Sequence, residues 1–132
     1  MAEEIKVGLI TNADGAHVSA YLSALAATDA CSSVVLADSD DAYNERARKA
    51  LGGKLTATYR LASEMLAKEK PVMTMVSLEA RFAPPAIEEV LEAGSHVFAE
   101  KPSCIEAADF APLVMKAESK HLNLMLALAN RL

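Results

Sequence analysis

Residues 5–25 have the sequence IKVGLITNADGAHVSAYLSAL. They open with the short apolar run 5–10, which has the length and the β-branched content of a buried strand. Asn12 and Gly15 follow, and both tolerate the positive φ angles of a tight turn. Apolar residues then recur at helical spacing, at Val18, Leu22 and Leu25. The stretch therefore predicts a strand, a turn and a helix in direct succession, the start of a βαβ unit.

The rest of the chain repeats this alternation. Further apolar runs predict strands at 33–37, 72–77, 96–99 and 124–129, with a weaker one at 55–59. Helices are predicted between them, at 41–51 and 60–68, from Pro84 and Pro85 to Gly94, and along a stripe of Phe110, Leu113, Val114 and Ala117. Ser103 and Glu106 have the spacing of a capping box before the last helix. Right-handed crossovers then predict an α/β fold, a doubly wound parallel sheet (Rossmann) of order 3-2-1-4-5-6 in a three-layer α/β/α arrangement.

Composition limits the possible functions. The chain has 132 residues, enough for one hydrophobic core, so we expect a single domain over 1–132. Its net charge is -5 and it has no run of Lys or Arg, which disfavours binding to nucleic acid or to an anionic membrane. The acidic start Met1-Ala2-Glu3-Glu4 is unlike a signal peptide, and no apolar run is long enough to span a membrane. Cys31 and Cys104 are interpreted as free thiols, and we expect a cytoplasmic protein.

A ligand crevice is expected at the carboxyl ends of the strands, where the strand order reverses. The turn after the first strand precedes a helix, so its backbone N–H groups and the helix dipole favour a pyrophosphate. Thr11, Ala13 and Ala16 hold the three glycine positions of the fingerprint GxGxxG of such turns. The fingerprint is degraded, because only the third position, which accepts glycine or alanine, is met. The charge of Asp14 also opposes a phosphate, whereas His17 could donate to one. The cofactor-side candidates in this turn are Thr11, Asn12, Ala13, Gly15 and Ala16.

Asp38 follows the second predicted strand and is a candidate for binding the adenosine ribose. A carboxylate there accepts hydrogen bonds from the ribose hydroxyls and repels a 2′-phosphate, which favours NAD and makes NADP the weaker candidate. The competing interpretation is that Asp38 or Asp40 caps the following helix. Ser77 and Leu78, at the end of the fourth strand, complete the predicted cofactor side of the crevice.

Glu100-Lys101-Pro102 follows the fifth predicted strand. A lysine at the carboxyl end of a strand faces the crevice, and partial burial would make its ammonium group a better proton donor. The Lys101-Pro102 bond is a candidate for the cis form, which would fix the direction of the Lys101 side chain. Lys101 is therefore the leading catalytic candidate. His17, His96 and His121 fall on separate elements, so no metal site is predicted.

Four stretches together resemble the cofactor-binding half of the Gfo/Idh/MocA oxidoreductases, the family of glucose-fructose oxidoreductase and inositol dehydrogenase. They are residues 7–10, 36–40, 93–102 and 124–131. The resemblance implies that Lys101 assists hydride transfer beside the nicotinamide, that Glu100 belongs to the cofactor pocket and that Asp38 binds the ribose. This sequence departs from the family in its glycine turn and in having Leu78-Glu79 where the family has Thr-Pro. The family's substrate domain would begin beyond Arg131 and is expected to be absent from this chain.

Two functions remain open from the sequence. The first is an NAD-binding domain of an oxidoreductase acting on a sugar, a polyol or a similar hydroxyl compound, without turnover by the isolated chain. The second is a Rossmann interaction module that has lost its cofactor. A homo-oligomer or a partner chain is expected to cover the face left by the absent domain.

Overall fold

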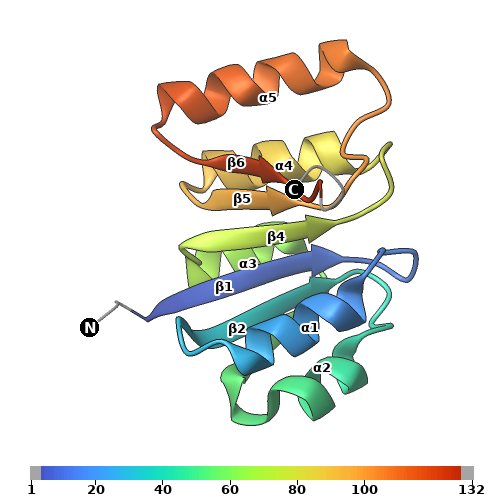
Figure 1. Ribbon diagram of the computed structural model, residues 1–132, viewed down its shortest axis with the longest axis vertical. Coiled ribbons are helices and arrows are strands. Elements are labelled where there is room, and N and C mark those ends of the chain that lie inside the picture. The colour runs from blue at the N-terminus through green and yellow to red at the C-terminus, as the bar shows by residue number, and fades with distance from the viewer. Residues whose placement is uncertain (1–3, 129–132) are drawn as a thin grey trace.

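The computed structural model describes residues 4–128, which form one parallel sheet with helices on both faces. The strands lie in the order β3-β2-β1-β4-β5-β6, as predicted (Figure 1). Their bounds are β1 Ile5–Thr11, β2 Cys31–Asp38, β3 Leu55–Tyr59, β4 Met73–Ser77, β5 His96–Ala99 and β6 Leu124–Leu126. The last strand is shorter than predicted, and Ala129, Asn130 and Arg131 lie outside the described residues. The doubly wound α/β fold is confirmed.

Five helices and one short 3-10 turn connect the strands. Their bounds are α1 Val18–Ala27, α2 Asn44–Leu51, the 3-10 turn Gly52–Lys54, α3 Ala62–Glu69, α4 Ala83–Glu92 and α5 Ala107–Ser119. Helix α2 begins later than the predicted residue 41, because Asp41 has a left-handed backbone (φ 54°) that a helix cannot contain. Helix α3 begins after Leu61, whose backbone is extended.

The predicted capping box before α5 is wrong. Glu106 has an extended backbone (φ -110°, ψ 140°) and is itself the residue that precedes the helix, so it cannot occupy the third helical position. Its side chain makes no capping hydrogen bond, and Ser103 is buried ahead of the helix. In the predicted apolar stripe, Leu113 and Ala117 are buried, whereas Val114 is exposed.

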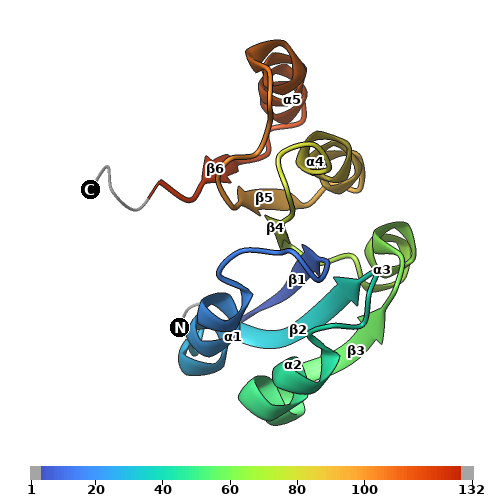
Figure 2. The same cartoon turned by 90° about the vertical axis from the view of Figure 1, so that its right-hand side faces the viewer.

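The helices form two layers that differ in extent. Helices α1 and α2 lie on one face of the sheet, and α3, α4 and α5 on the other (Figure 2). Each layer encloses its own apolar cluster. One is centred on Leu9, Leu22 and Leu36 and the other on Met65, Ile87 and Val97. The sheet therefore contributes to an apolar core on each of its two faces, which accounts for its nearly continuous apolar strands.

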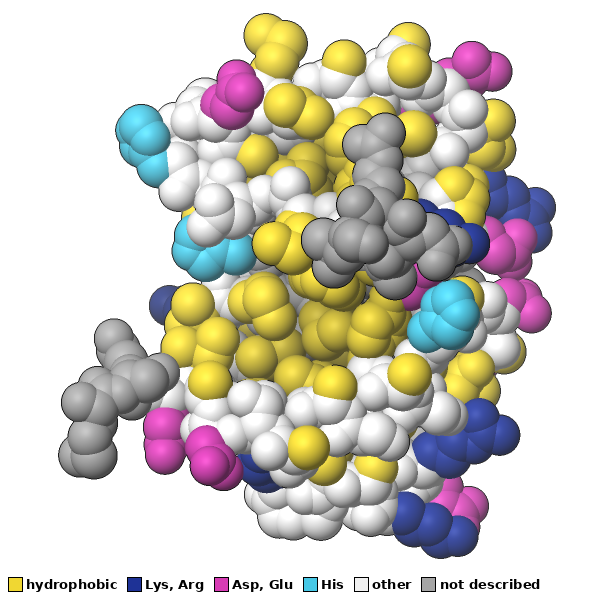
Figure 3. All heavy atoms as spheres, in the orientation of Figure 1, with side chains coloured by type: hydrophobic (Ala, Val, Ile, Leu, Met, Phe, Trp, Pro, Cys, Tyr) yellow, Lys and Arg dark blue, Asp and Glu magenta, His cyan; other side chains and the backbone are white. Residues whose placement is uncertain are grey.

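The face that carries α1 is left partly open. Met75 from β4 belongs to the α1 cluster, Met73 and Phe98 from β4 and β5 are partly buried at its margin, and Met125 from β6 is exposed beyond them. Figure 3 shows hydrophobic side chains gathered between α1 and α5 on this face. Among residues 4–128, no helix covers these strands on that side.

Strand register brings the candidate residues to one edge of the sheet. Thr11, the last residue of β1, pairs with Asp38 on β2 and with Ser77 on β4. Since all strands are parallel, the ends of β1, β2, β4 and β5 share this carboxyl edge. The fold therefore positions Thr11, Asp38, Ser77 and Glu100 along one line.

No helix within 4–128 is both long and apolar enough to cross a membrane. No group of three or more His, Cys, Asp and Glu side chains in that part of the chain could hold a metal ion.

Candidate functional site

Thr11 and Gly15 shape the turn between β1 and α1. The Thr11 side chain is buried, and its Oγ1 donates to the Ser77 carbonyl oxygen at 2.9 Å. A Cβ atom at Gly15 would lie 2.0 Å from Thr11 Oγ1 and 2.8 Å from the Ser77 carbonyl oxygen. Thr11 stands at the first glycine position of the fingerprint. Its side chain fills the space that a Cβ atom at residue 15 would need, so residue 15 must be glycine.

Positive φ falls elsewhere in the turn than predicted. Neither Asn12 nor Gly15 adopts it, and the left-handed residue is His17, with φ 58° immediately before α1. The turn closes through the Gly15 N–H, which donates to the Asn12 carbonyl oxygen at 3.1 Å. Ser77 Oγ donates to the Ala16 carbonyl oxygen at 2.6 Å and fastens the turn to β4.

The N–H groups at the tip of the turn already have partners. The Asp14 N–H donates to Asn12 Oδ1 at 2.9 Å, and the Ala13 N–H donates to Asp40 Oδ2 at 2.8 Å. Asp40 belongs to the loop after β2 and was not predicted to contact this turn. The donors expected to meet a pyrophosphate are therefore held by the protein's own side chains.

Asp38 is completely buried, with both carboxylate oxygens engaged. Oδ1 accepts the Asp40 N–H at 2.9 Å, and Oδ2 accepts the Tyr43 N–H at 2.8 Å. Tyr43 is the residue immediately before α2. Asp38 thus holds the residues that lead into α2, which agrees with the competing interpretation that it caps this helix. Each carboxylate oxygen keeps a second lone pair for another donor.

A pocket of about 310 Å³ opens beside these two loops. Its lining comes from the ends of four strands and the residues after them: Ile10, Thr11, Asn12, Ala37, Ser39, Arg60, Leu61, Ala62, Leu78, Phe82 and Ala86. Arg60 is held by Asp41, with its Nε 2.6 Å from Oδ2. The pocket thus combines an apolar wall with one guanidinium group, a pairing that suits a flat heterocycle.

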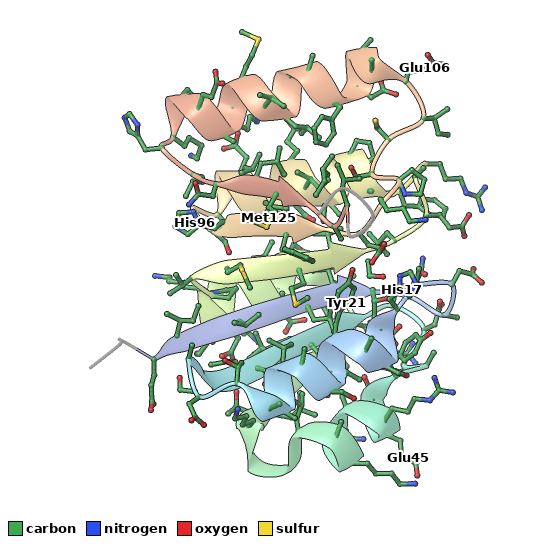
Figure 4. All side chains as sticks on the ribbon, viewed as in Figure 1. His17, Tyr21, Glu45, His96, Glu106 and Met125 are labelled. Atoms are coloured by element: carbon green, nitrogen blue, oxygen red, sulfur yellow. The ribbon has the colours of Figure 1, made fainter. Side chains whose placement is uncertain are left out.

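Glu100 anchors the other end of the crevice. Its carboxylate is 4% exposed, accepts a hydrogen bond from the Tyr21 hydroxyl and lies 3.2 Å from His17 Nδ1. Its Oε1 also accepts the Lys101 N–H at 3.1 Å. Figure 4 shows His17 and Tyr21 at the same end of α1, while His96 lies at the opposite end of the sheet. Glu100 therefore connects α1, which follows β1, to the segment after β5, and β4 lies between β1 and β5 in the sheet.

Lys101 is exposed, rather than partly buried as predicted. The peptide bond before Pro102 is cis. Among residues 4–128 the Lys101 ammonium group has no ion-pair or hydrogen-bond partner, whereas the neighbouring Glu100 carboxylate has three. The lysine thus presents an accessible positive charge beside an anchored carboxylate.

The structure brings most predicted residues together in two groups. Thr11, Asn12, Ala13, Gly15, Ala16, Asp38, Ser77 and Leu78 lie around the β1–α1 turn and the pocket, and Glu100 and Lys101 lie at the end of β5. Sequence reasoning missed Asp40, Arg60 and Tyr21. One signal was available for Tyr21, because it lies on the first turn of the predicted helix, four residues after His17.

Comparison with known proteins gives a consistent result. The sequence model of an oxidoreductase family, Gfo/Idh/MocA, described by its NAD-binding Rossmann fold, matches residues 6–128. A search of curated proteins gives no match.

Solved structures resemble the chain closely in fold. One is scyllo-inositol dehydrogenase from Lactobacillus casei with bound NAD(H) and scyllo-inositol, with TM-score 0.85, 20% identity and 98% of this chain covered. A second is WlbA dehydrogenase from Bordetella pertussis with NADH and UDP-GlcNAcA, with TM-score 0.80, 22% identity and 99% covered. A third is a variant of KijD10, a 3-ketoreductase from Actinomadura kijaniata, with TDP-benzene and NADP; TM-score is 0.79, identity 26% and coverage 94%. This chain spans 37% of the first two proteins and 38% of the third.

Proposed function

The chain belongs to the Gfo/Idh/MocA oxidoreductase family, and we propose that its carboxyl-edge crevice binds NAD as the cofactor half of a dehydrogenase site. The observation that carries this proposal is that the β1–α1 turn, Asp38 and the 310 Å³ pocket lie next to one another, at the point where the strand order reverses. Open parallel sheets bind dinucleotides at that point.

The pocket is the proposed adenine site. Leu61, Leu78 and Phe82 supply apolar contacts, and Arg60 supplies a planar cation that stacks on an aromatic ring. Asp41 holds the Arg60 guanidinium at the pocket's margin. These residues fit a purine because apolar walls with one oriented polar group are typical of small-molecule sites.

Asp38 is the proposed ribose residue and the reason for preferring NAD to NADP. Each of its oxygens accepts one backbone N–H and retains capacity for a ribose hydroxyl. A 2′-phosphate would instead meet its negative charge. Because Asp38 is fully buried, the loop residue Asp40, which donates to it, must shift for the hydroxyls to reach the carboxylate.

At the other end of the crevice, Glu100 and Lys101 form the proposed cofactor side of the reaction centre. The chemistry that the dinucleotide supplies is hydride transfer at its nicotinamide. Glu100 holds the segment after β5 against α1 through Tyr21 and His17. Lys101 is then positioned to orient or polarise the hydroxyl oxygen of a sugar, a polyol or a similar compound. We expect the 132-residue chain to bind cofactor without steady turnover, and turnover with any polyol and NAD would contradict that expectation.

A second candidate is an interaction module without cofactor, working with a second copy or another chain. Two observations favour it: the Ala13 N–H of the β1–α1 turn is already bonded to Asp40, and Met125 is exposed beside Phe98. Two free thiols, Cys31 and Cys104, favour a reducing compartment such as the cytoplasm for either function.

Titration calorimetry with NAD and NADP separates the two candidates. The first predicts saturable NAD binding that is tighter than NADP binding. No binding of either cofactor up to about 10 mM supports the second. Leu61→Ala should weaken NAD binding about threefold to tenfold by removing part of the pocket wall. The matched control is Ile105→Ala, because Ile105 is similarly exposed (68% against 62%) but does not line the pocket. Equal effects of the two substitutions would contradict the placement of the adenine.

A further inference from the structure

Asp40 joins two loops at the crevice. Its backbone N–H donates to Asp38 Oδ1 at 2.9 Å, while its side-chain Oδ2 accepts the Ala13 N–H at 2.8 Å. One residue of the loop after β2 therefore contacts the end of its own strand and the tip of the turn after β1. Asp40 is exposed, so its side chain can leave this contact without disturbing the core.

The contact with Ala13 places a carboxylate where the turn would otherwise meet an anion. Backbone N–H groups just before a helix attract negatively charged ligands. Here two consecutive N–H groups are satisfied internally, that of Ala13 by the Asp40 carboxylate and that of Asp14 by the Asn12 side chain. The carboxylate carries the same charge sign and the same acceptor atoms as a phosphate oxygen, so both cannot accept from the Ala13 N–H at once.

We propose that Asp40 is an internal competitor of the cofactor's pyrophosphate, and that its carboxylate must leave Ala13 before the dinucleotide binds. The proposal rests on the proposed function and adds a residue that lowers cofactor affinity. The same displacement of Asp40 would free the Ala13 donor and loosen the loop that is bonded to Asp38. Asp14 is the matched comparison, because its carboxylate is exposed in the same turn but accepts no hydrogen bond within residues 4–128.

The test uses the full chain in three variants, Asp40→Ala, Asp40→Asn and Asp14→Asn. Inorganic pyrophosphate and NAD are titrated separately by calorimetry, and the Ala13 amide is followed by NMR and by its hydrogen-exchange rate. Asp40→Ala should bind both ligands about tenfold more tightly than the parent chain and should speed exchange at Ala13, because a charge-assisted hydrogen bond no longer has to be broken. Asp40→Asn should gain less than Asp40→Ala, since its amide oxygen still accepts from Ala13. Asp14→Asn removes a charge from the same turn without releasing a donor, so it should gain less pyrophosphate affinity than Asp40→Asn and should leave Ala13 exchange unchanged.

The outcomes separate this proposal from the proposed function. If Asp40→Ala gains pyrophosphate affinity but no variant binds NAD, Asp40 does compete with an anion at the turn, but the proposed function fails and with it the claim about the cofactor. If the parent and Asp40→Ala bind NAD equally, the proposed function stands and the competitor is overturned. Weaker binding by Asp40→Ala, equal gains from Asp14→Asn and Asp40→Asn, or no pyrophosphate binding by any variant would also overturn the competitor.

Discussion

The two ends of the crevice are built in opposite ways. At the adenosine end the pocket is open, but the polar groups beside it, Asp38 and the Ala13 N–H, are engaged with neighbouring loop residues. At the other end Glu100 is buried and fully bonded, while Lys101 is exposed with no partner among the described residues. Under the proposed function, we therefore expect affinity for the cofactor to be determined at the first end, and Lys101 to act in the reaction with little effect on binding or stability.

The largest expected effect is on the turn at the adenosine end. Gly15→Ala should lower the free energy of unfolding by about 2–3 kcal/mol, because its new Cβ would overlap Thr11 Oγ1 and crowd a backbone carbonyl. Urea unfolding measures the change. In the Thr11→Ala background the same substitution should cost at least about 1 kcal/mol less, since the overlapping hydroxyl is gone. Equal costs in both backgrounds would contradict the packing of Thr11 against Gly15.

The next largest effect on stability is expected at the other end of the crevice, at Glu100. Glu100→Ala should lower the free energy of unfolding by about 2 kcal/mol, because the Tyr21 hydroxyl, His17 and the Lys101 N–H lose a shared acceptor. Glu106→Ala, in the same segment but exposed, should stay within about 0.5 kcal/mol of the parent chain. Similar costs for both residues would show that Glu100 is not an anchor.

Asp38→Asn is expected to weaken NAD binding about tenfold and to narrow the preference for NAD over NADP, because one charged acceptor is lost. Calorimetry with both cofactors gives the two affinities. A uniform loss for both cofactors would indicate that Asp38 only organises the loop before α2.

The smallest effect is expected at Lys101. Lys101→Ala should change the free energy of unfolding by less than about 0.5 kcal/mol, as is usual for an exposed residue, and NAD affinity by less than about threefold. Thermal unfolding and calorimetry check the two values. A loss of NAD affinity greater than tenfold would contradict the expectation that the Lys101 end of the crevice contributes little to binding.

The sequence predicts the strands and their order because buried parallel strands appear as continuous apolar runs separated by helical periods. It also predicts the location of the site, since strand ends and their loops follow from that order. The helix starts are less predictable. Asp41 delays α2 through its left-handed backbone, and the extended Glu106 delays α5, and neither conformation follows from a spacing rule.

Contacts between segments that are distant in the sequence are the part that sequence reasoning missed. The bond from Ala13 to Asp40 joins residues 27 positions apart, and that between Tyr21 and Glu100 joins residues 79 apart. Each depends on where two segments meet in space, and neither segment alone carries a pattern for it. Residue type was informative even so, because Asp40 and Glu100 follow strand ends, where side chains of neighbouring loops converge.

The central claim is that NAD binds along this edge of the sheet, and amide chemical-shift mapping by NMR tests it most directly. Addition of NAD to the 132-residue chain should produce saturable shifts at Asn12, Ala13, Ser39, Leu61 and Leu78, with smaller ones near Lys101. An absence of saturable shifts up to about 10 mM NAD, or shifts confined to the face of Met125 and Phe98, would contradict it.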